Sequence, residues 1–514
     1  MKRLALATIA VLAGCAPGND DHAGTSLRVD AVGSLADPAG IPRQLVLGAT
    51  GAGLTAADGS GRIVPGLASS WRIANDGRSI IFRLRAAVWP DGSPVVATDI
   101  VTLLRRRAAP ASPVRAYLDP IENAAAIGRS EIAVTALGVG APVADVVEIR
   151  LAAPAAELLA ALALPDLAVR RDPPRGSGRG DLLQPGLGAF DAAKVATAAN
   201  VGARPLVLQR NPRYHALTGV SLGKIALLPV DDPGAAISDF AHNRADLVVG
   251  RDLAGLSDAR LLGPQVLHVE PTWGVYGYLA NVRRGPLADI RVRRALAMAV
   301  DRSSLGPRLF GLALQPVDGL LPLGMAGDPV PLLPDWAILA PAGRVEQARA
   351  LLAAAGYDTA HPLTLAVSLP PGREHSAVLA AVAADWRAIG VTISEIEFAP
   401  KLLEAAIKRG DFELALSETT VPVDTPSLLL RRFRCGSNSG GYCNPAADAA
   451  LARAAAEPGA LTAAVAALLA DPPLIPLFRP VRWALVRPNV SGWVNNIAGQ
   501  HPLASLGVTD RRQR

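Results

Sequence analysis

The 514-residue chain has few aromatic, histidine and cysteine side chains. Phe, Trp and Tyr make up 4% of the residues, which leaves few stacking surfaces of the kind that hold sugars or haem. The 7 His residues are scattered and form no cluster with the 3 Cys residues, so the sequence gives no support for a zinc site. We therefore expect neither a metal ion nor a cofactor in this protein.

Motifs that carry catalysis or nucleotide binding are also missing. The chain has no P-loop sequence, so we expect no nucleotide site. No Gly-x-Ser-x-Gly elbow stands at a predicted strand-to-helix turn, and no pair of carboxylates emerges that would suit glycoside hydrolysis. These absences argue against a secreted hydrolase and predict that the protein is not an enzyme.

The overall composition is that of a globular protein, with 50% hydrophobic and 19% charged residues. The net charge of +6 comes from Arg residues spread along the chain, without a basic stripe interleaved with aromatics, so we expect no nucleic-acid binding. Beyond the first residues, no apolar run is long and unbroken enough for a membrane-spanning helix. A chain of this length suggests roughly three domain-sized units.

The N-terminus has the features of an export signal. The chain begins with a short basic region, Met1 to Arg3. An apolar stretch from Leu4 to Val11 follows and is too short to span a bilayer. The residues Leu-Ala-Gly then precede Cys15. This pattern predicts a lipoprotein signal peptide over residues 1–14, followed by a lipidated Cys15 and a flexible tether over residues 15–26. An ordinary secretory signal with an incidental cysteine is the alternative. Acyl chains on Cys15 would hold the protein at a membrane surface without a spanning helix.

The other two cysteines lie close together in a polar loop. Cys435 and Cys443 are separated by a Gly-rich segment, and in an oxidising envelope such a pair favours a disulfide over a metal site. Closing so short a loop contributes about 2–3 kcal/mol, so the bond would serve to pin one loop.

The stretch from Gly61 to Ile100 is the most informative part of the sequence. Asn75-Asp76-Gly77 predicts a tight turn between two strand-like segments, so a hairpin is the simplest local interpretation. Trp89 to Pro94 predicts a second turn, and Thr98-Asp99 can cap a helix that continues through Leu104. The order of residues, from IVPGLASSW to DGSPVVATDI, resembles the start of the family 5 extracellular solute-binding proteins, which are dipeptide, oligopeptide and nickel receptors of ABC importers.

The same resemblance continues, in the same order, from about Leu27 to Val508. Its most specific later segment is LADIRVRRALAMAVDRSSL, from Leu287 to Leu305, for which we expect a helix capped by Asp289 with an apolar stripe in the core and its Arg residues at the sides. Further strands and helices alternate after it, with strands predicted over Leu363 to Leu369 and Val391 to Ile396, which favours βαβ units. The segment from Ala108 to Val147 matches little, and its Pro, Gly and Ala residues suggest loops. The remaining matching segments are Leu206–Tyr214, Ile237–Val249, Tyr276–Asn281, Arg344–Tyr357, Pro473–Phe478 and Ala484–Trp493.

The resemblance implies an α/β fold of the bilobal periplasmic-binding-protein type: type II, from the large cluster with an extra subdomain. Two chain crossings, near Glu270 to Tyr276 and near Pro472 to Pro480, would form the hinge. The implied division is lobe I over residues 27–270, with an inserted subdomain at roughly 48–165, lobe II over residues 271–475, and a C-terminal return into lobe I over residues 476–514.

The implied function is that of a substrate-binding lipoprotein of an ABC importer. It would capture a peptide or peptide-like solute between its lobes and deliver it to the permease and ATPase subunits for transmembrane transport. The protein would be a monomer in the periplasm or cell envelope, touching the membrane only through its lipid anchor. Two alternatives remain: a degenerate relative that binds or senses without transport, and a receptor for a non-peptide ligand such as a nickel complex, an oligosaccharide or an opine-like compound.

The position of the family's ammonium-binding Asp is altered in this chain. Peptide receptors of the family place that Asp in a segment resembling ADYPDP, and an ungapped match puts it on Pro422. Our hypothesis is that Asp424 or Glu418 replaces it after a small shift of the loop. The loss matters because a buried ammonium without a carboxylate costs several kcal/mol.

Other expected ligand contacts follow from the same resemblance. Arg373 is the nearest candidate for the family's carboxylate-binding Arg, with a solvated loop Arg beside Glu374 as the alternative. Trp273 and Tyr276 are expected near the first crossing, with hinge packing as the alternative for Trp273. A run of three arginines either attracts an anionic ligand or lies on a solvated face: Arg431, Arg432 and Arg434. The expected ligand-binding set is Trp273, Tyr276, Arg373, Glu418, Thr420 and Asp424.

Overall fold

The computed structural model describes residues 25–171, 182, 186–192, 205–325, 332–437, 440–457 and 459–509. The predicted signal peptide, the proposed lipidation site Cys15 and nearly all of the predicted tether lie outside the described residues. Within the described ranges, none of the helices combines the length and the hydrophobicity that crossing a bilayer requires.

One part of the molecule, which we call lobe I, is built on a seven-stranded sheet with the strand order β12-β18-β11-β1-β10-β9-β8. The central strand β1 pairs in parallel with β10 and β11, and the outer pairs are antiparallel. The strands are β1 (Ser26–Val32), β8 (Phe190–Ala192), β9 (Leu206–Arg210), β10 (Lys224–Val230), β11 (Leu247–Gly250), β12 (Leu267–Pro271) and β18 (Val481–Val486).

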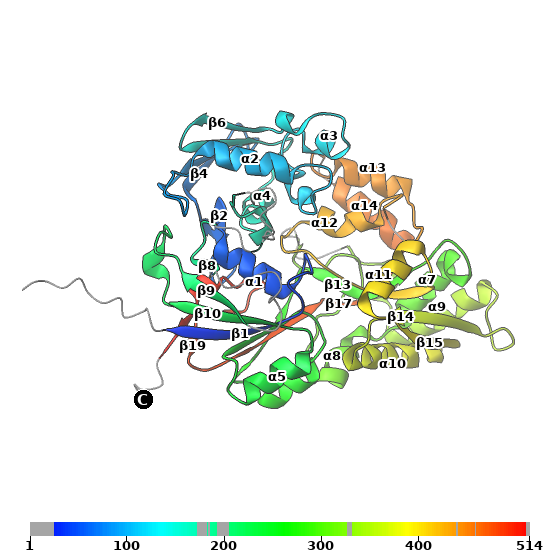
Figure 1. Cartoon of the computed structure of the whole chain (residues 1–514). Helices are drawn as coiled ribbons and strands as arrows, with labels where there is room; N and C mark the ends of the chain where they lie inside the picture. Colours follow the sequence, from blue (N-terminus) through cyan, green and yellow to red (C-terminus); the bar gives the residue numbers. More distant parts are fainter. Residues whose placement is uncertain are drawn as a thin grey trace, which may run out of the picture.

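Helices cover both faces of this sheet. Helix α1 (Ile41–Thr50) packs on one face with the buried residues Leu27 and Val29, and α5 (Pro233–Ala241) packs on the other with Val248. Figure 1 shows α1 above and α5 below the sheet. Strand β1 contributes Leu27 and Val29 to the core on the α1 side and Val32 to the core on the α5 side, although Arg28 and Asp30 interrupt its apolar residues.

Lobe II is built on a five-stranded sheet with the order β15-β14-β16-β13-β17. Helices α7 to α10 share a core with one face of the sheet, and α13 and α14 share a core with the other. The strands are β13 (Gly274–Ala280), β14 (Leu363–Leu369), β15 (Val391–Glu397), β16 (Leu414–Thr420) and β17 (Leu474–Phe478). The helices are α7 (Ile290–Ala299), α8 (Arg302–Phe310), α9 (Pro341–Ala354), α10 (Arg373–Ala388), α11 (Pro400–Arg409), α12 (Pro426–Leu430), α13 (Pro445–Arg453) and α14 (Ala460–Ala470).

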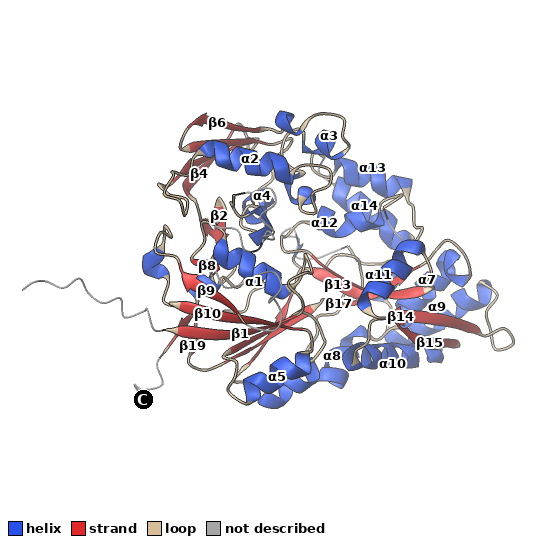
Figure 2. Cartoon of the chain, in the orientation of Figure 1, coloured by secondary structure: helices blue, strands red, loops and turns tan. Residues whose placement is uncertain are grey.

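A separate subdomain is inserted after α1 and has a hydrophobic core of its own. Its main sheet has four strands in the order β4-β5-β7-β6, beside which β2 and β3 form a small hairpin. Figure 2 shows this sheet and α2 apart from the two larger sheets. The elements are β2 (Thr55–Ala57), β3 (Ile63–Pro65), β4 (Ala68–Ala74), β5 (Ser79–Leu84), α2 (Ala97–Arg107), α3 (Ala124–Gly128), β6 (Val139–Val143), β7 (Val146–Arg150) and α4 (Glu157–Ala161).

The hairpin predicted in the opening stretch is present in this subdomain. Strands β4 and β5 pair in an antiparallel register, and Asn75, Asp76 and Gly77 all have positive φ in the turn between them. The following helix starts earlier than predicted, after Val96, and Asp99 accepts a hydrogen bond from the Val96 N–H at 3.1 Å. Asp99, in the first turn of the helix, therefore accepts a hydrogen bond from the N–H of the capping residue Val96, which would otherwise lack a partner.

The chain passes twice between the two large sheets. Residues 272–273 connect β12 of lobe I to β13 of lobe II, and residues 479–480 connect β17 of lobe II to β18 of lobe I. Strand β17 pairs with β13, so the return to lobe I begins after Phe478 and not at residue 476 as expected from the sequence. The strands β19 (Val490–Ser491) and β20 (Gly507–Val508) then pair near the C-terminus.

The segment from Leu287 to Leu305 is not one helix. Asp289 caps α7 as predicted, accepting a hydrogen bond from the Arg291 N–H at 2.8 Å, but Val300 is extended and a second helix, α8, begins at Arg302. Arg302 is 3% exposed and donates to the carbonyl oxygens of Ala297 (2.7 Å) and Val300 (3.2 Å) at the break. The break is tolerated because this guanidinium takes the place of the missing helical N–H donors.

Arg293, expected at the side of the predicted helix, is instead 4% exposed. Its guanidinium donates to the carbonyl oxygens of Leu287 (2.6 Å) and Pro472 (2.9 Å) and pairs with Asp471. Arg293 therefore ties α7 to the start of β17.

Candidate functional site

The two lobes meet where strands of both sheets end. Glu418 lies near the carboxyl end of β16 in lobe II, and Asp252 follows the carboxyl end of β11 in lobe I. The negative charge of Asp252 acts on Glu418 across the two lobes. We call this region the inter-lobe junction. Ligands of open α/β sheets bind outside the carboxyl ends of strands, so this is the expected position for a binding site.

Glu418 is a partly buried carboxyl group in the junction. Burial, reinforced by the charge of Asp252, raises the pKa of Glu418 to about 8, against weaker opposing effects of Arg251 and Arg482. Within the described residues its carboxylate has no hydrogen bond or ion pair. Burial therefore favours the neutral, protonated form of Glu418.

Arg373 forms an ion pair across the two lobes, so its guanidinium is not free to bind a solute. Its guanidinium lies 2.9 Å from the carboxylate of Asp258 in lobe I, and its side chain is 62% exposed. The neighbouring Glu374 is 4% exposed and accepts a hydrogen bond from the Ser257 N–H of lobe I at 3.4 Å. Arg373 was expected to bind a ligand carboxylate, but its guanidinium is already paired with a carboxylate of the opposite lobe.

Arg373→Gln is expected to change ligand affinity by only a few-fold, because an exposed ion pair contributes about 0–1 kcal/mol. For the same reason the variant without ligand should keep a radius of gyration close to that of the parent, as measured by small-angle scattering. Arg387→Gln, an exposed residue at the end of the same helix, is the matched control. A loss of affinity of about 100-fold or more would show that Arg373 binds the ligand directly.

Tyr276 belongs to the core and offers no surface to a ligand in this conformation. It is 0% exposed, its hydroxyl lies 3.0 Å from Nδ1 of His375, and its ring stacks on Phe478 at a centroid distance of 4.5 Å. Burial raises the pKa of Tyr276 and lowers that of His375, so both are neutral at pH 7. Tyr276 therefore packs against Phe478 and His375 in the core, and its expected contact with a ligand stays a prediction.

Trp273 packs between the two chain crossings that form the hinge. It lies in the first crossing, is 9% exposed, and carries Arg479 from the second crossing over its ring at 4.4 Å. Arg479 also donates to the Thr272 carbonyl oxygen at 2.6 Å and to Oε1 of Gln315 at 2.8 Å. The hinge-packing alternative for Trp273 thus agrees with its position, and Arg479, which the sequence gave no reason to select, joins the two crossings.

The two remaining expected residues differ in their surroundings. Asp424 is partly buried and its charge favours the ionised form of Arg479, so this carboxylate already faces a cation. Thr420 is exposed, ends β16, and pairs in register with Gly274 beside the first crossing. Pro422 follows, where the resemblance expected an Asp. Both substitutes that the sequence suggested lie within the field of positive charge, Asp424 near Arg479 and Glu418 near Arg251 and Arg482.

Arg432 departs from the rest of its arginine run. Arg431 and Arg434 are exposed, and both act on Asp119 of the inserted subdomain. Arg432 turns inward and donates a hydrogen bond from Nη2 to Oγ of Ser417, the residue before Glu418. Burial lowers the pKa of Arg432 to about 10, and within the described residues no carboxylate pairs with it. The sequence run could suggest an anion site but could not tell which arginine faces inward.

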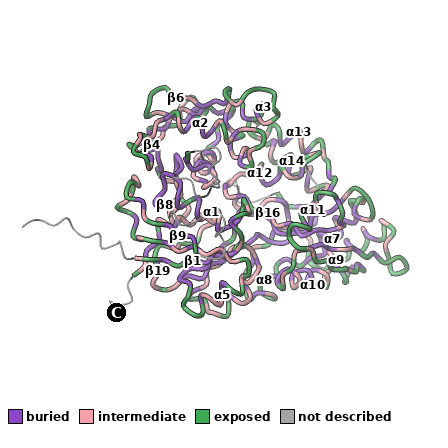
Figure 3. The backbone as a smooth tube through the Cα atoms, viewed as in Figure 1, coloured by how far each residue is buried: buried purple, intermediate pink, exposed green. Residues whose placement is uncertain are grey.

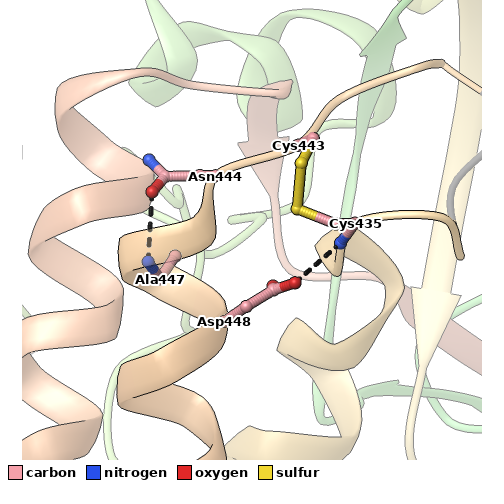
Figure 4. Close-up of a disulfide and its surroundings, with 5 residues drawn as sticks. All are labelled: Cys435, Cys443, Asn444, Ala447 and Asp448. Carbon is pink, nitrogen blue, oxygen red and sulfur yellow. Dashed lines mark hydrogen bonds between the residues drawn. A yellow bond between two sulfur atoms is a disulfide. The ribbon is translucent and has the colours of Figure 1, made fainter.

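Cys435 and Cys443 form a disulfide that closes the loop after α12. Figure 4 shows this bond beside α13, where Asp448 accepts a hydrogen bond from the Cys435 N–H at 2.9 Å and Asn444 accepts one from the Ala447 N–H at 3.1 Å. No group of three His, Cys, Asp or Glu side chains suited to a metal ion occurs in the described part of the chain.

Replacing both cysteines by serine is expected to lower the free energy of unfolding by about 2–3 kcal/mol, because the short loop regains freedom in the unfolded chain. Urea unfolding followed by circular dichroism measures the change. Reducing the parent protein should lower its stability to the level of the variant. Equal stability of the oxidised parent and the variant would show that the bond does not constrain the loop.

A cavity of about 380 Å³ lies within lobe II and away from the junction. Its walls come from β14, the end of β15 and the segments flanking β13 and β16. Its lining includes Arg284, Ser368, Ile396, Asp411 and Glu413.

The two-sheet arrangement recurs in known proteins. Solved structures with the same arrangement include the murein tripeptide binding protein MppA of Escherichia coli (TM-score 0.81, 25% identity, 95% of this chain and 99% of that chain) and OppA of Burkholderia pseudomallei (TM-score 0.80, 26% identity, 95% and 99%). These likenesses confirm the predicted α/β bilobal fold.

Curated relatives match over most of their length. The periplasmic murein peptide-binding protein MppA of Escherichia coli is 28% identical over 90% of this chain and 88% of its own. A second protein of that organism, named "Probable deoxycholate-binding periplasmic protein YgiS", is 28% identical over 86% of this chain and 84% of its own. The model for bacterial extracellular solute-binding proteins, family 5 Middle, matches residues 62–441. With that match over most of its length, together with the two lobes joined by two crossings, the chain belongs to the family 5 bacterial extracellular solute-binding proteins.

Proposed function

We propose that this protein captures a peptide or peptide-like solute between its lobes and delivers it to the permease of an ABC importer. Family membership supports the binding role, and relatives named as oligopeptide-binding and murein peptide-binding proteins support the peptide class. The observation that carries the proposal is the junction, where strand ends of both lobes bring together charged side chains beside the two crossings.

The hinge supports capture by closure. Only the segments 272–273 and 479–480 join the two large sheets along the described chain, and Arg479 with Trp273 fastens them to each other. The ion pair of Arg373 with Asp258 across the lobes is exposed, so it adds little stability to the closed state. A ligand that touches both lobes would therefore decide the equilibrium between open and closed forms.

The envelope setting extends this proposal. The relatives are named periplasmic, and the predicted signal and Cys15 would place this chain in the periplasm or cell envelope as a lipid-anchored monomer. Residues 27–270 with the C-terminal return would form one lobe, and 271 to Phe478 the other. The protein would perform no chemistry on the solute, and ATP hydrolysis would take place in the importer's ATPase subunits.

Cys15→Ser is expected to move the protein from the membrane fraction to the soluble periplasmic fraction, because the acyl chains would be lost. Fractionation after labelling with a fatty-acid analogue measures both anchoring and lipidation. Label that persists in the variant would place the lipid on another residue and contradict the assignment of Cys15.

A thermal-shift screen tests the proposed ligand class. Tri- to pentapeptides are expected to raise the melting temperature, because a ligand that binds only the folded protein stabilises it by mass action. Amino acids, oligosaccharides and nickel complexes should give no shift. Peptides without effect, together with a shift by another class, would overturn the peptide assignment.

A second candidate ligand is a carboxylate-bearing non-peptide. Arg432, which lacks a carboxylate partner in the described part of the chain, favours an anionic group, and one relative is named as deoxycholate-binding. Deoxycholate therefore belongs in the same screen. A shift by deoxycholate alone would select this candidate over the peptide.

A further inference from the structure

Lobe II contains a concave site of its own, the cavity of about 380 Å³, at the end of its sheet that is remote from the junction. Glu413 lines this cavity and directly precedes β16, whereas Glu418 stands near the other end of the same strand. At about 3.3 Å per residue, the two glutamates lie about 16 Å apart along the chain. The cavity is therefore separate from the region between the lobes.

The cavity exists because β16 begins too late to cover β14. Strand β14 pairs with β15 from Leu363 to Leu369 but pairs with β16 only at Val367 and Ser368. The Ala366 N–H donates instead to the carboxylate of Glu413 at 2.6 Å. The space beside the uncovered half of β14 is concave and can hold a small molecule.

Hydrogen bonds fix the walls around this space. The side-chain amide of Asn281, in the segment after β13, donates to the carbonyl oxygens of Gly410 at 2.9 Å and Phe412 at 2.8 Å. On the other side, the Phe398 N–H donates to the carbonyl oxygen of Leu369 at 3.0 Å. Walls held in this way give the site its shape before a ligand arrives, which lowers the cost of binding.

Apolar side chains form much of the wall. Leu287, Phe398 and Phe412 line the cavity, and two of these three are aromatic. Ile396, at the end of β15, also lines it and is 42% exposed although it is a large hydrophobic residue. The apolar body of a ligand would cover Ile396 and the two rings, and removing that surface from water favours binding.

One buried hydroxyl points into the cavity. Ala366 and Ser368 lie on one face of β14, opposite to Leu365 and Val367, which belong to the core that includes α7 to α10. Ser368 is 2% exposed, and its hydroxyl has no hydrogen bond within the described ranges. A buried hydroxyl without a partner costs free energy, so Ser368 would gain from a polar atom of a ligand.

The charges around the cavity favour a cationic group. The Glu413 carboxylate is partly buried, and among the described residues it accepts one backbone hydrogen bond and pairs with no cation. Asp411 is already paired with Arg409 at 2.7 Å, and Arg284 is exposed, so solvent screens its charge. A primary ammonium group brings three N–H donors, enough for Glu413 and Ser368 together.

We propose that this cavity is a second ligand site, which binds a primary amine with an aromatic or branched apolar body. The ammonium group pairs with Glu413 and donates a hydrogen bond to Ser368, while the apolar body packs against Phe398 and Phe412. The site lies within one lobe, so its occupation requires neither closure of the lobes nor a solute between them. The inference goes beyond the proposed function and does not depend on it.

Calorimetric titration of the full chain tests this proposal with three probes that share a benzene ring and differ in charge. The probes are 2-phenylethylamine, 3-phenylpropionate and L-phenylalanine. The amine should bind at least about tenfold more tightly than either other probe, because their carboxylates would face Glu413. Equal or tighter binding of a carboxylate probe, or no binding of the amine, would overturn the inference.

Variants of the cavity walls then locate the bound amine. Glu413→Gln keeps an oxygen for the Ala366 N–H but removes the charge, so it should weaken the amine at least about tenfold. Ser368→Ala should weaken it several-fold, the worth of one hydrogen bond. Ala366→Leu should abolish binding by filling the cavity, and it decides the question if Glu413→Gln does not fold. Glu404→Gln, an exposed acid of α11 paired with Lys408, is the control and should bind as the parent does.

Circular dichroism of each variant checks that it is folded. Unchanged binding in Glu413→Gln and Ala366→Leu would place the amine elsewhere, and an equal loss in the control would reveal an effect of net charge alone. Either result overturns the inference. Peptide binding is a separate measurement: a parent that binds peptide but no amine refutes this site alone, and one that binds the amine but no peptide refutes the proposed function alone.

Discussion

Replacing Arg302 with methionine is expected to lower the free energy of unfolding by about 3–5 kcal/mol, the cost of breaking a buried, hydrogen-bonded charge. The guanidinium is 3% exposed and donates to the carbonyl oxygens of Ala297, Val300 and Pro476, the last at 2.8 Å. Methionine fills a similar volume but donates nothing, so these carbonyl groups lose their donors at the helix break and at β17. Chemical unfolding followed by circular dichroism measures the loss.

The control for this prediction is Arg308→Met on the same helix. Arg308 is exposed, so its replacement should change stability by less than about 0.5 kcal/mol. Loss of β17 contacts would also loosen the second crossing. A change in Arg302→Met as small as that of the control would show that the hydrogen bonds at the break do not hold the lobe together.

Glu418→Gln is expected to stabilise the protein without ligand by about 1–3 kcal/mol near pH 8 and to leave it unchanged near pH 4. The folded pKa of about 8 lies above the ordinary value of 4.5, so the folded state holds a proton that the unfolded state releases as pH rises. The parent therefore loses stability between these two values, and glutamine, which mimics the protonated carboxyl, does not. Opening of the lobes relieves part of the cost of ionising Glu418. The expected change in stability is therefore smaller than the full shift of the Glu418 pKa would give.

Thermal unfolding of both proteins across this pH range provides the measurement. The difference in melting temperature should grow from about pH 4.5 to about pH 8 and then remain constant. Ligand should reverse the order of stability, because a bound cation favours the ionised parent. A difference that stays constant over the whole range would mean that Glu418 is not held in its protonated form.

Local pattern was enough to predict the elements in the C-terminal half. The strand predicted from Leu363 to Leu369 matches β14, and the strand predicted from Val391 is β15. These segments have apolar alternation and clear flanking turns, so neighbouring residues alone identify them. The segment from Ala108 to Val147 was expected to be loop, because Ala, Gly and Pro hide the short strand β6 and the start of β7.

The roles of single site residues depended on partners that are distant in sequence. Tyr276 looked like a site residue from its place near a crossing, but the stack with Phe478 and the contact with His375 place it in the core. Arg373 looked available until Asp258 of the other lobe was seen to pair with it. Burial and pairing across lobes leave no mark on a single stretch of sequence.

Burial differs similarly among residues of one type. Arg293 and Arg302 are almost fully buried, whereas Arg431 and Arg434 are exposed, although all four sit in arginine-containing segments of ordinary appearance. Figure 3 shows the sheets of both lobes as mostly buried and the outer loops as exposed, a contrast that composition does not reveal. The carbonyl oxygens that hold the buried arginines come from distant turns and helix ends, which only the fold brings together.

Native mass spectrometry of the full chain with a mixed pool of tri- to pentapeptides tests the central claim most directly. Capture without chemistry predicts a complex of one protein with one peptide, and a peptide mass on release equal to that of an intact member of the pool. Absence of any bound peptide, or release of shortened peptides, would contradict a binding protein that closes around its solute.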